Sequence, residues 1–215
     1  MSLIFLLPFL FLKIQADDIN VNKTICNGVQ TNFDIKSIIG YWYVMSVVPT
    51  TESRENWENV PCYKVEFSET EEAGLRWLVN NTLESEMASN MVGRIKEGML
   101  VRQRYFSEQP FDIWSKAIDG VNGCFQQVLT LDLQRSPFSE GITNDAMMQL
   151  HIIENGDPEK GIPGPILVQK LFGKVLIAVI YRREKDVDPD SLVNVIVDYL
   201  SQTQPIRFPY AADCY

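Results

Sequence analysis

Short runs of apolar or alternating residues recur along the chain, separated by turn-forming residues. Repeated runs of this kind predict the strands of an all-β sandwich or barrel. The runs occupy residues 41–48, 62–67, 74–80, 99–106, 111–118, 124–133, 147–153 and 171–182. A turn at Phe172-Gly173-Lys174 would split the last run, so eight or nine strands are expected. The segment 155–165 is rich in glycine and proline and is expected to be a loop.

Alternation within a run predicts which side chains share a face. Tyr63, Val65 and Phe67 fall on one side of their strand, and the charged residues between them fall on the other. This pattern is typical of antiparallel sheets with one buried and one solvated face. Residues 83–98 are neither periodic nor clearly a loop, so the sequence leaves this segment unassigned.

One helix is expected near the C-terminus. Asp188 can cap its first N–H groups, and Pro189 suits the first helical turn. An apolar face at helical spacing follows, formed by Leu192, Val193, Ile196, Val197 and Leu200. Such a face predicts a helix packed against the outside of a sheet.

Composition and charge fit one globular domain and argue against nucleic acid as a partner. The chain has 215 residues, of which 46% are hydrophobic and 22% charged. Domains of this composition and length are common. The formal net charge of −9 repels phosphate backbones, and no cluster of Lys and Arg offsets it.

The N-terminal residues 1–16 are predicted to be a cleaved signal peptide. Residues 3–12 are almost unbroken apolar residues, and Ala16 is a small residue at the cleavage position. Ten residues are too short to span a bilayer as a helix, which needs about 20. An uncleaved anchor or an interior strand is the alternative. Residues 17–215 would then form a single secreted domain without a transmembrane segment.

The cysteines are consistent with an oxidising compartment. Cys26, Cys62, Cys124 and Cys214 are even in number, which favours two disulfides and leaves three connectivities open. None of them has metal-ligand spacing, so no metal site is expected. Two glycosylation sequons begin at Asn22 and Asn80. Secretion would expose both of them to glycosylation.

The segment Phe33-Asp34-Ile35-Lys36-Ser37-Ile38-Ile39-Gly40-Tyr41-Trp42-Tyr43 resembles the first conserved segment of the lipocalins. It is most similar to the apolipoprotein D-like and insect bilin-carrier branch of that family. The resemblance implies an eight-stranded antiparallel up-and-down calyx barrel with a C-terminal α-helix packed outside. In such a barrel Gly40 would allow close backbone approach, and Trp42 would pack across the closed end.

The same resemblance implies further pairings. In lipocalins an arginine after the last strand stacks on the first-strand tryptophan, which makes Arg182 the expected partner of Trp42. The family's disulfide from the second strand to the C-terminal tail corresponds to Cys62–Cys214. By analogy, Cys26 would pair with Cys124 and hold the N-terminal arm.

An eight-stranded barrel has an interior that is either filled by side chains or just wide enough for one small ligand. The side chains predicted to line it are Val44, Tyr63, Val65, Phe67, Trp77, Tyr105, Phe111, Leu129, Leu131 and Leu150. Side chains of these types are more often part of an ordinary packed core than in contact with a ligand. Trp77 and Tyr105 are the strongest candidates, because aromatic rings with a polar tip suit amphipathic ligands. Whether they face the interior depends on unbroken alternation along the strand, and one bulge would turn them to the other face.

No catalytic residue and no cofactor are expected. His151 is the only histidine, so any haem ligand or Ser-His-Asp triad would have to use it, and no G-x-S-x-G segment accompanies it. A solvated strand histidine is the simpler interpretation. The acidic segment 52–58 could form a binding rim at the barrel mouth or an ordinary solvated loop.

Two functions remain open from the sequence. The preferred one is a secreted, non-catalytic carrier that binds a small hydrophobic ligand such as a lipid, retinoid or bilin, with a cell-surface receptor as a further partner. The other is an extracellular protein-interaction or matrix module with a filled barrel. A filled barrel would bring large side chains from opposing strands together, whereas a carrier would keep a cavity of about 300 Å³ or more.

Overall fold

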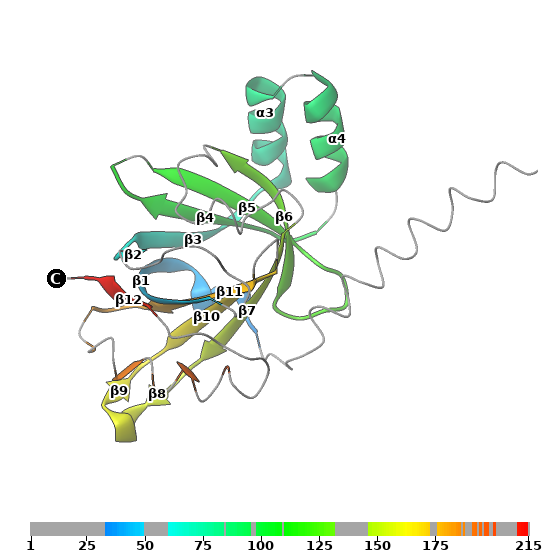
Figure 1. Cartoon of the computed structure of the whole chain (residues 1–215). Coiled ribbons are helices and arrows are strands. Elements are labelled where there is room, and N and C mark those ends of the chain that lie inside the picture. Colours follow the sequence, from blue (N-terminus) through cyan, green and yellow to red (C-terminus); the bar gives the residue numbers. More distant parts are fainter. Residues whose placement is uncertain are drawn as a thin grey trace, which may run out of the picture.

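A computed structural model describes residues 33–49, 60–83, 85–95, 98–108, 110–131, 146–172, 176–185, 187, 191, 192, 194, 196, 197, 200 and 210–214. Its main feature is a closed antiparallel barrel (Figure 1). Eight strands form it in ring order: β1 (Gly40–Pro49), β3 (Lys64–Thr70), β4 (Leu100–Phe106), β5 (Phe111–Ala117), β6 (Cys124–Leu131), β7 (Met147–Ile153), β10 (Ile166–Phe172) and β11 (Leu176–Arg182). Pairing of β11 with β1 closes the ring, which confirms the predicted all-β barrel.

The two ends of the barrel differ in how much of them is described. Helix α2 (Ile35–Ile38) precedes β1 and lies at one end, called here the closed end. Because neighbouring strands are antiparallel, β4, β6 and β10 also begin at the closed end. At the opposite end, called the far end, the connections 50–59, 132–145 and 173–175 lie outside the described residues.

Trp42 and an arginine seal the closed end, but the arginine is Arg183. The Trp42 indole donates a hydrogen bond to the carbonyl of Ile38 at 2.7 Å, and the Arg183 guanidinium lies 4.0 Å from the centre of the indole ring. The prediction of Arg182 is therefore wrong by one residue. Arg182 follows the inward-facing Tyr181, so it points outward and donates to the carbonyl of Pro163 at 2.7 Å.

Arg183 also joins α2 to β1 through backbone carbonyls. Its guanidinium donates to the carbonyl oxygens of Ser37, Ile39 and Tyr41 at 2.9–3.0 Å. Gly40 sits beneath it with a φ of +104°, where a Cβ would lie 3.1 Å from the Arg183 Nη1 atom. Glycine is therefore needed here both for its backbone conformation and for the space that the arginine occupies.

A helical hairpin between β3 and β4 replaces one predicted strand. Residues 74–80 were expected to be a strand, but they lie in α3 (Glu72–Thr82), which α4 (Ser85–Ile95) follows. Leu75 and Val79 are one helical turn apart and are buried against Trp114 on the outer face of the barrel. A short apolar run fits either element by periodicity alone, and here the packing on the barrel decides for a helix.

Small elements complete the described structure. The predicted loop 155–165 contains a two-stranded hairpin, β8 (Gly156–Asp157) and β9 (Ile162–Pro163), joined by the 3₁₀ helix η2 (Pro158–Lys160). Near the C-terminus, β12 (Tyr210–Asp213) pairs with β1 and lies parallel to β2 (Val60–Pro61).

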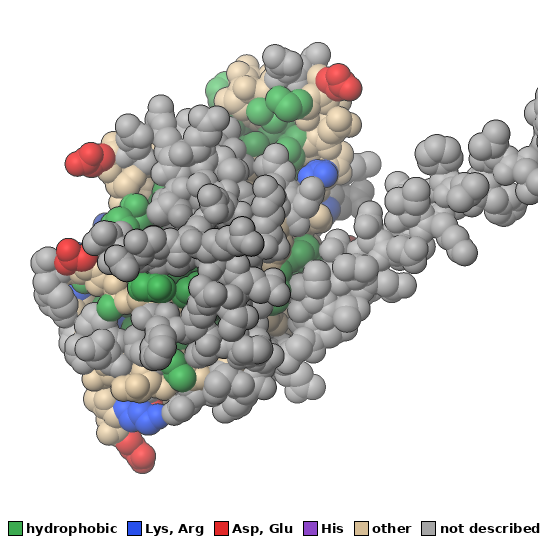
Figure 2. Space-filling model, in the orientation of Figure 1, with side chains coloured by type: hydrophobic (Ala, Val, Ile, Leu, Met, Phe, Trp, Pro, Cys, Tyr) green, Lys and Arg blue, Asp and Glu red, His purple; other side chains and the backbone are tan. Residues whose placement is uncertain are grey.

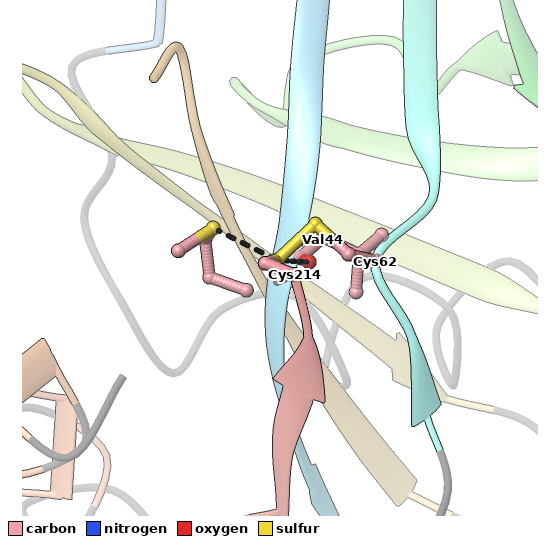
Figure 3. The surroundings of a disulfide bond; sticks show 4 residues. Val44, Cys62 and Cys214 are labelled. Carbon is pink, nitrogen blue, oxygen red and sulfur yellow. Dashed lines mark hydrogen bonds between the residues drawn. A yellow bond between two sulfur atoms is a disulfide. The ribbon is translucent and has the colours of Figure 1, made fainter. Parts of the chain in front are cut away.

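A disulfide fastens this C-terminal strand to the barrel (Figure 3). Cys62 and Cys214 are bonded, which confirms the predicted pair, and the Cys62 N–H donates to the carbonyl of Asp213. The bond closes a sequence separation of 152 residues, a loop size for which disulfides contribute about 2–5 kcal/mol. Cys124 is also disulfide-bonded, but its predicted partner Cys26 lies outside the described residues.

The predicted C-terminal helix is described only in part. Individual residues within it are helical, and Leu192, Ile196 and Leu200 are buried in one cluster with Met45 and Ile180. Since the rest of that segment lies outside the described residues, the helix and its packing stay a prediction, as does the signal peptide over 1–16. Among the described residues, no helix is long and apolar enough to cross a membrane.

We expect Arg183→Lys to lower the free energy of unfolding by about 1–3 kcal/mol, because an ammonium cannot serve three carbonyls and an indole in the same geometry. Chemical denaturation measures the change. Arg104→Lys, on the outer face of β4, is the control and should change stability by less than about 0.5 kcal/mol. Equal losses in the two variants would contradict the role assigned to Arg183.

Candidate functional site

The inward-facing side chains of the barrel form one apolar core with an aromatic wall near the far end. Tyr63 precedes β3, Tyr105 ends β4 and Phe111 begins β5, so all three lie toward that end. The Tyr105 and Phe111 rings stack with centroids 4.5 Å apart, and Tyr63 meets each of them edge-on at 6.2 and 6.4 Å. Tyr63 is only partly buried, whereas the other two are almost completely buried.

A hydrogen-bonded polar cluster lies within this apolar interior. The side-chain amides of Gln103 and Gln169 bond reciprocally, with N–O distances of 2.9 and 3.3 Å. The Tyr181 hydroxyl donates to Gln169 Oε1 and lies 2.9 Å from the Tyr105 hydroxyl oxygen. The Gln169 amide also donates to the Met148 sulfur. The four polar side chains Gln103, Gln169, Tyr105 and Tyr181, called the core polar cluster, are at most 1% exposed.

The core polar cluster connects opposite walls of the barrel. Gln103 is on β4 and Gln169 is on β10, and these strands are four apart in either direction around the eight-stranded ring. Their direct contact means that side chains fill the interior at this level. Between the cluster and the far end, the interior is bordered by the aromatic wall.

Burial holds the core tyrosines in their neutral form. It raises the pKa of Tyr105 and of Tyr181 well above the usual phenol value, because a phenolate would be desolvated inside the barrel. The pKa of the partly exposed Tyr63 is raised for the same reason. Both hydroxyls therefore keep the protons that their hydrogen bonds in the core polar cluster use.

Most of the residues predicted to line the interior do face it. Seven belong to the interior cluster or pack against it: Val44, Tyr63, Val65, Phe67, Tyr105, Phe111 and Leu150. Whether they touch a ligand stays a prediction. Gln103 and Gln169 are not among the residues predicted to line the interior. Strand alternation puts Gln103 on the same face as Tyr105. A glutamine on an otherwise apolar face is the sequence feature that could have identified it.

Three of the predicted lining residues do not fit that role. Trp77 lies on α3 with 68% of its surface exposed, so it does not face the interior. In β6 an extra residue, Val128, interrupts the pairing with β5, and this bulge turns Leu129 to the outer face, where it packs near Trp114. Leu131 pairs with Asp112 beyond the same bulge, and its side chain lies outside the described residues.

The remaining predicted sites are only partly placed. Asn80 is exposed on α3, and Asn22 lies outside the described residues, so glycosylation of either stays a prediction. The acidic segment 52–58 is also outside them. His151 lies on the outer side of β7, where burial and the nearby Lys170 lower its pKa. Within the described part of the chain, no group of three His, Cys, Asp or Glu side chains is arranged to hold a metal.

A second concave surface lies outside the barrel, between α3 and the strands β3–β5. It is a groove of about 460 Å³ that exposes Trp77 beside Gly74 and Glu71. The Arg102–Asp112 ion pair crosses its floor with N–O distances of 3.0 and 2.8 Å, close to Trp114. Figure 2 shows hydrophobic side chains on the surface of the helical hairpin above this region.

Comparison with known proteins does not assign this chain to a family. A scan against models of protein families finds no match. A search of curated proteins finds none either.

We expect Gln103→Leu to lower the free energy of unfolding by about 1–3 kcal/mol, because it leaves the Gln169 amide without its amide partner in the core. Adding Gln169→Leu should recover part of that loss, since the amide that lost its Gln103 partner is then removed as well. Urea denaturation of both variants tests this. If Gln103→Leu alone left the free energy of unfolding unchanged, the amide pair would not matter for stability.

We also expect stability to fall as the pH rises above about 10. An unfolded phenol ionises near its ordinary pKa of 10.0, whereas the folded Tyr105 and Tyr181 do not, so the unfolded state loses protons first. The contribution of these tyrosines is therefore present below that pH and is lost above it. Unfolding free energies measured at about pH 8 and about pH 11 should differ less in Tyr105→Phe than in the wild type. An identical drop in both proteins would exclude Tyr105 as a cause.

Proposed function

We propose that this protein is a secreted, lipocalin-like carrier that holds a small hydrophobic ligand in the far-end part of its barrel. The observation that carries the proposal is an apolar barrel interior with an aromatic wall and a small set of polar groups. Ligand pockets typically combine mostly apolar lining with a few placed polar groups. The wall consists of Tyr63, Tyr105 and Phe111.

The mechanism requires binding and release without catalysis. Transfer of an apolar ligand from water to the aromatic wall is favourable by about 25 cal/mol for each Å² of apolar surface removed from solvent. The core polar cluster forms the base of the proposed site, so the ligand would enter from the far end. The predicted signal peptide over 1–16, the even number of cysteines and the sequons at Asn22 and Asn80 support secretion. A cell-surface receptor remains part of this proposal as a partner.

A second candidate is an extracellular interaction or matrix module that uses the same barrel as a rigid support. The contact between Gln103 and Gln169 across the barrel favours it, because the interior is filled at that level. The exposed Trp77 beside the outer groove also favours it, since tryptophans are enriched among the residues that dominate protein interfaces.

Titration of delipidated protein with the neutral fluorescent probe N-phenyl-1-naphthylamine separates the two candidates. A carrier should bind it, and Tyr63→Ala should weaken binding by about threefold to tenfold through loss of one aromatic contact. Trp77→Ala is the matched control, because it removes an aromatic ring outside the barrel, and should leave the dissociation constant unchanged. Absence of binding to the wild-type protein would contradict the carrier and favour the interaction module.

A further inference from the structure

We propose that the carrier selects ligands whose buried part is uncharged, such as those ending in a hydroxyl or carbonyl, and discriminates against carboxylates. This inference rests on the proposed function and concerns the same interior. It rests on a difference between the two faces of the described barrel strands: the polar side chains that face inward are uncharged, whereas the charged ones face outward.

Within the described part of the chain, the buried polar side chains on the inner face of the barrel are all neutral. Besides the core polar cluster they include Ser115 and Gln127, which lie on its closed-end side and are each at most 2% exposed. The Ser115 hydroxyl oxygen is buried without a hydrogen-bond partner in the described part of the chain. The interior therefore offers hydroxyl and amide groups, which can exchange hydrogen bonds with a neutral polar group but supply no charge.

The charged side chains of the described barrel strands are excluded from that interior. Pairing and alternation place the following on the outer face: Lys64, Glu66, Arg102, Arg104, Asp112, Lys116, Lys170 and Arg182. Glu69 alternates with the inward-facing Val65 and Phe67, but it lies at the end of β3 and is exposed. Arg183 is held at the closed end by three carbonyls and Trp42, so its charge already has partners.

Among the described side chains, a carboxylate buried beside the core polar cluster would consequently find no cation to pair with. Burying an unpaired charge costs far more than burying a hydroxyl that finds a hydrogen bond. The raised pKa values of Tyr105 and Tyr181 agree with this, because they report that the same interior disfavours a phenolate. An alcohol or ketone avoids the cost, and its oxygen can bond to an amide or hydroxyl of the cluster.

A matched pair of ligands tests the proposal on the wild-type protein. 1-Tetradecanol and tetradecanoate have the same chain length and differ in the charge of one end, and each can compete with N-phenyl-1-naphthylamine at about pH 8, where the acid is ionised. We expect the alcohol to displace the probe at a concentration at least about tenfold lower than the carboxylate, since only the carboxylate loses hydration without gaining a cation.

A variant pair extends the test to the cause. Leu171 faces inward near the far end of β10, so Leu171→Lys places an ammonium in the interior, and Leu171→Met is the matched control without charge. The lysine variant should shift the preference toward the carboxylate by about tenfold, whereas the methionine variant should keep the preference of the wild type.

The outcomes distinguish this inference from the function on which it rests. If the carboxylate displaces the probe from the wild type as well as the alcohol does, or better, the selection against charge is wrong and the carrier remains. If neither compound nor the probe binds to the wild type, the carrier is wrong, and the selectivity fails with it.

Discussion

Closure of the sheet by the pairing of β1 with β11 is the constraint on which the rest of the structure depends. Val44 pairs with Tyr181 and Val47 with Val179, so all of these side chains face one shared interior. A closed ring leaves no unpaired strand edge among the eight strands, and it removes the inward-facing side chains from bulk water. A polar group inside is then stabilised only by a partner that is also inside, because an unmatched buried amide or hydroxyl costs about 1–3 kcal/mol.

Polar groups find their partners in different ways at the closed end and in the middle of the barrel. At the closed end the indole of Trp42 bonds to a carbonyl of α2 and carries the Arg183 guanidinium on its ring. Further in, Gln103 and Gln169 bond to each other from opposite walls. These polar contacts thus hold the barrel in one arrangement from the closed end to the core polar cluster. In the proposed carrier, the apolar and aromatic side chains toward the far end would select a ligand by its shape and by the absence of charge.

Strand alternation explains both the successes and the errors of the sequence analysis. It placed Tyr105 correctly in the interior, and applied one step further it would have selected Arg183, because residues 179, 181 and 183 share a face. It failed at Leu129, since the bulge at Val128 comes from pairing with β5 and leaves no local signal. It failed at Trp77 because a short apolar run cannot distinguish a strand from a helix that packs on a barrel. The disulfide between Cys62 and Cys214 was reached only through resemblance to the lipocalins, as the cysteine count alone left three connectivities open.

The central claim is that the barrel carries a small hydrophobic molecule, and native mass spectrometry of protein secreted from its own cell type tests it most directly. The spectrum would be recorded before and after extraction with an organic solvent. The account predicts the loss of one discrete mass of a few hundred daltons, together with an extractable hydrophobic compound that has no ionisable acid. A single unchanged protein mass, with nothing in the extract, would contradict the carrier.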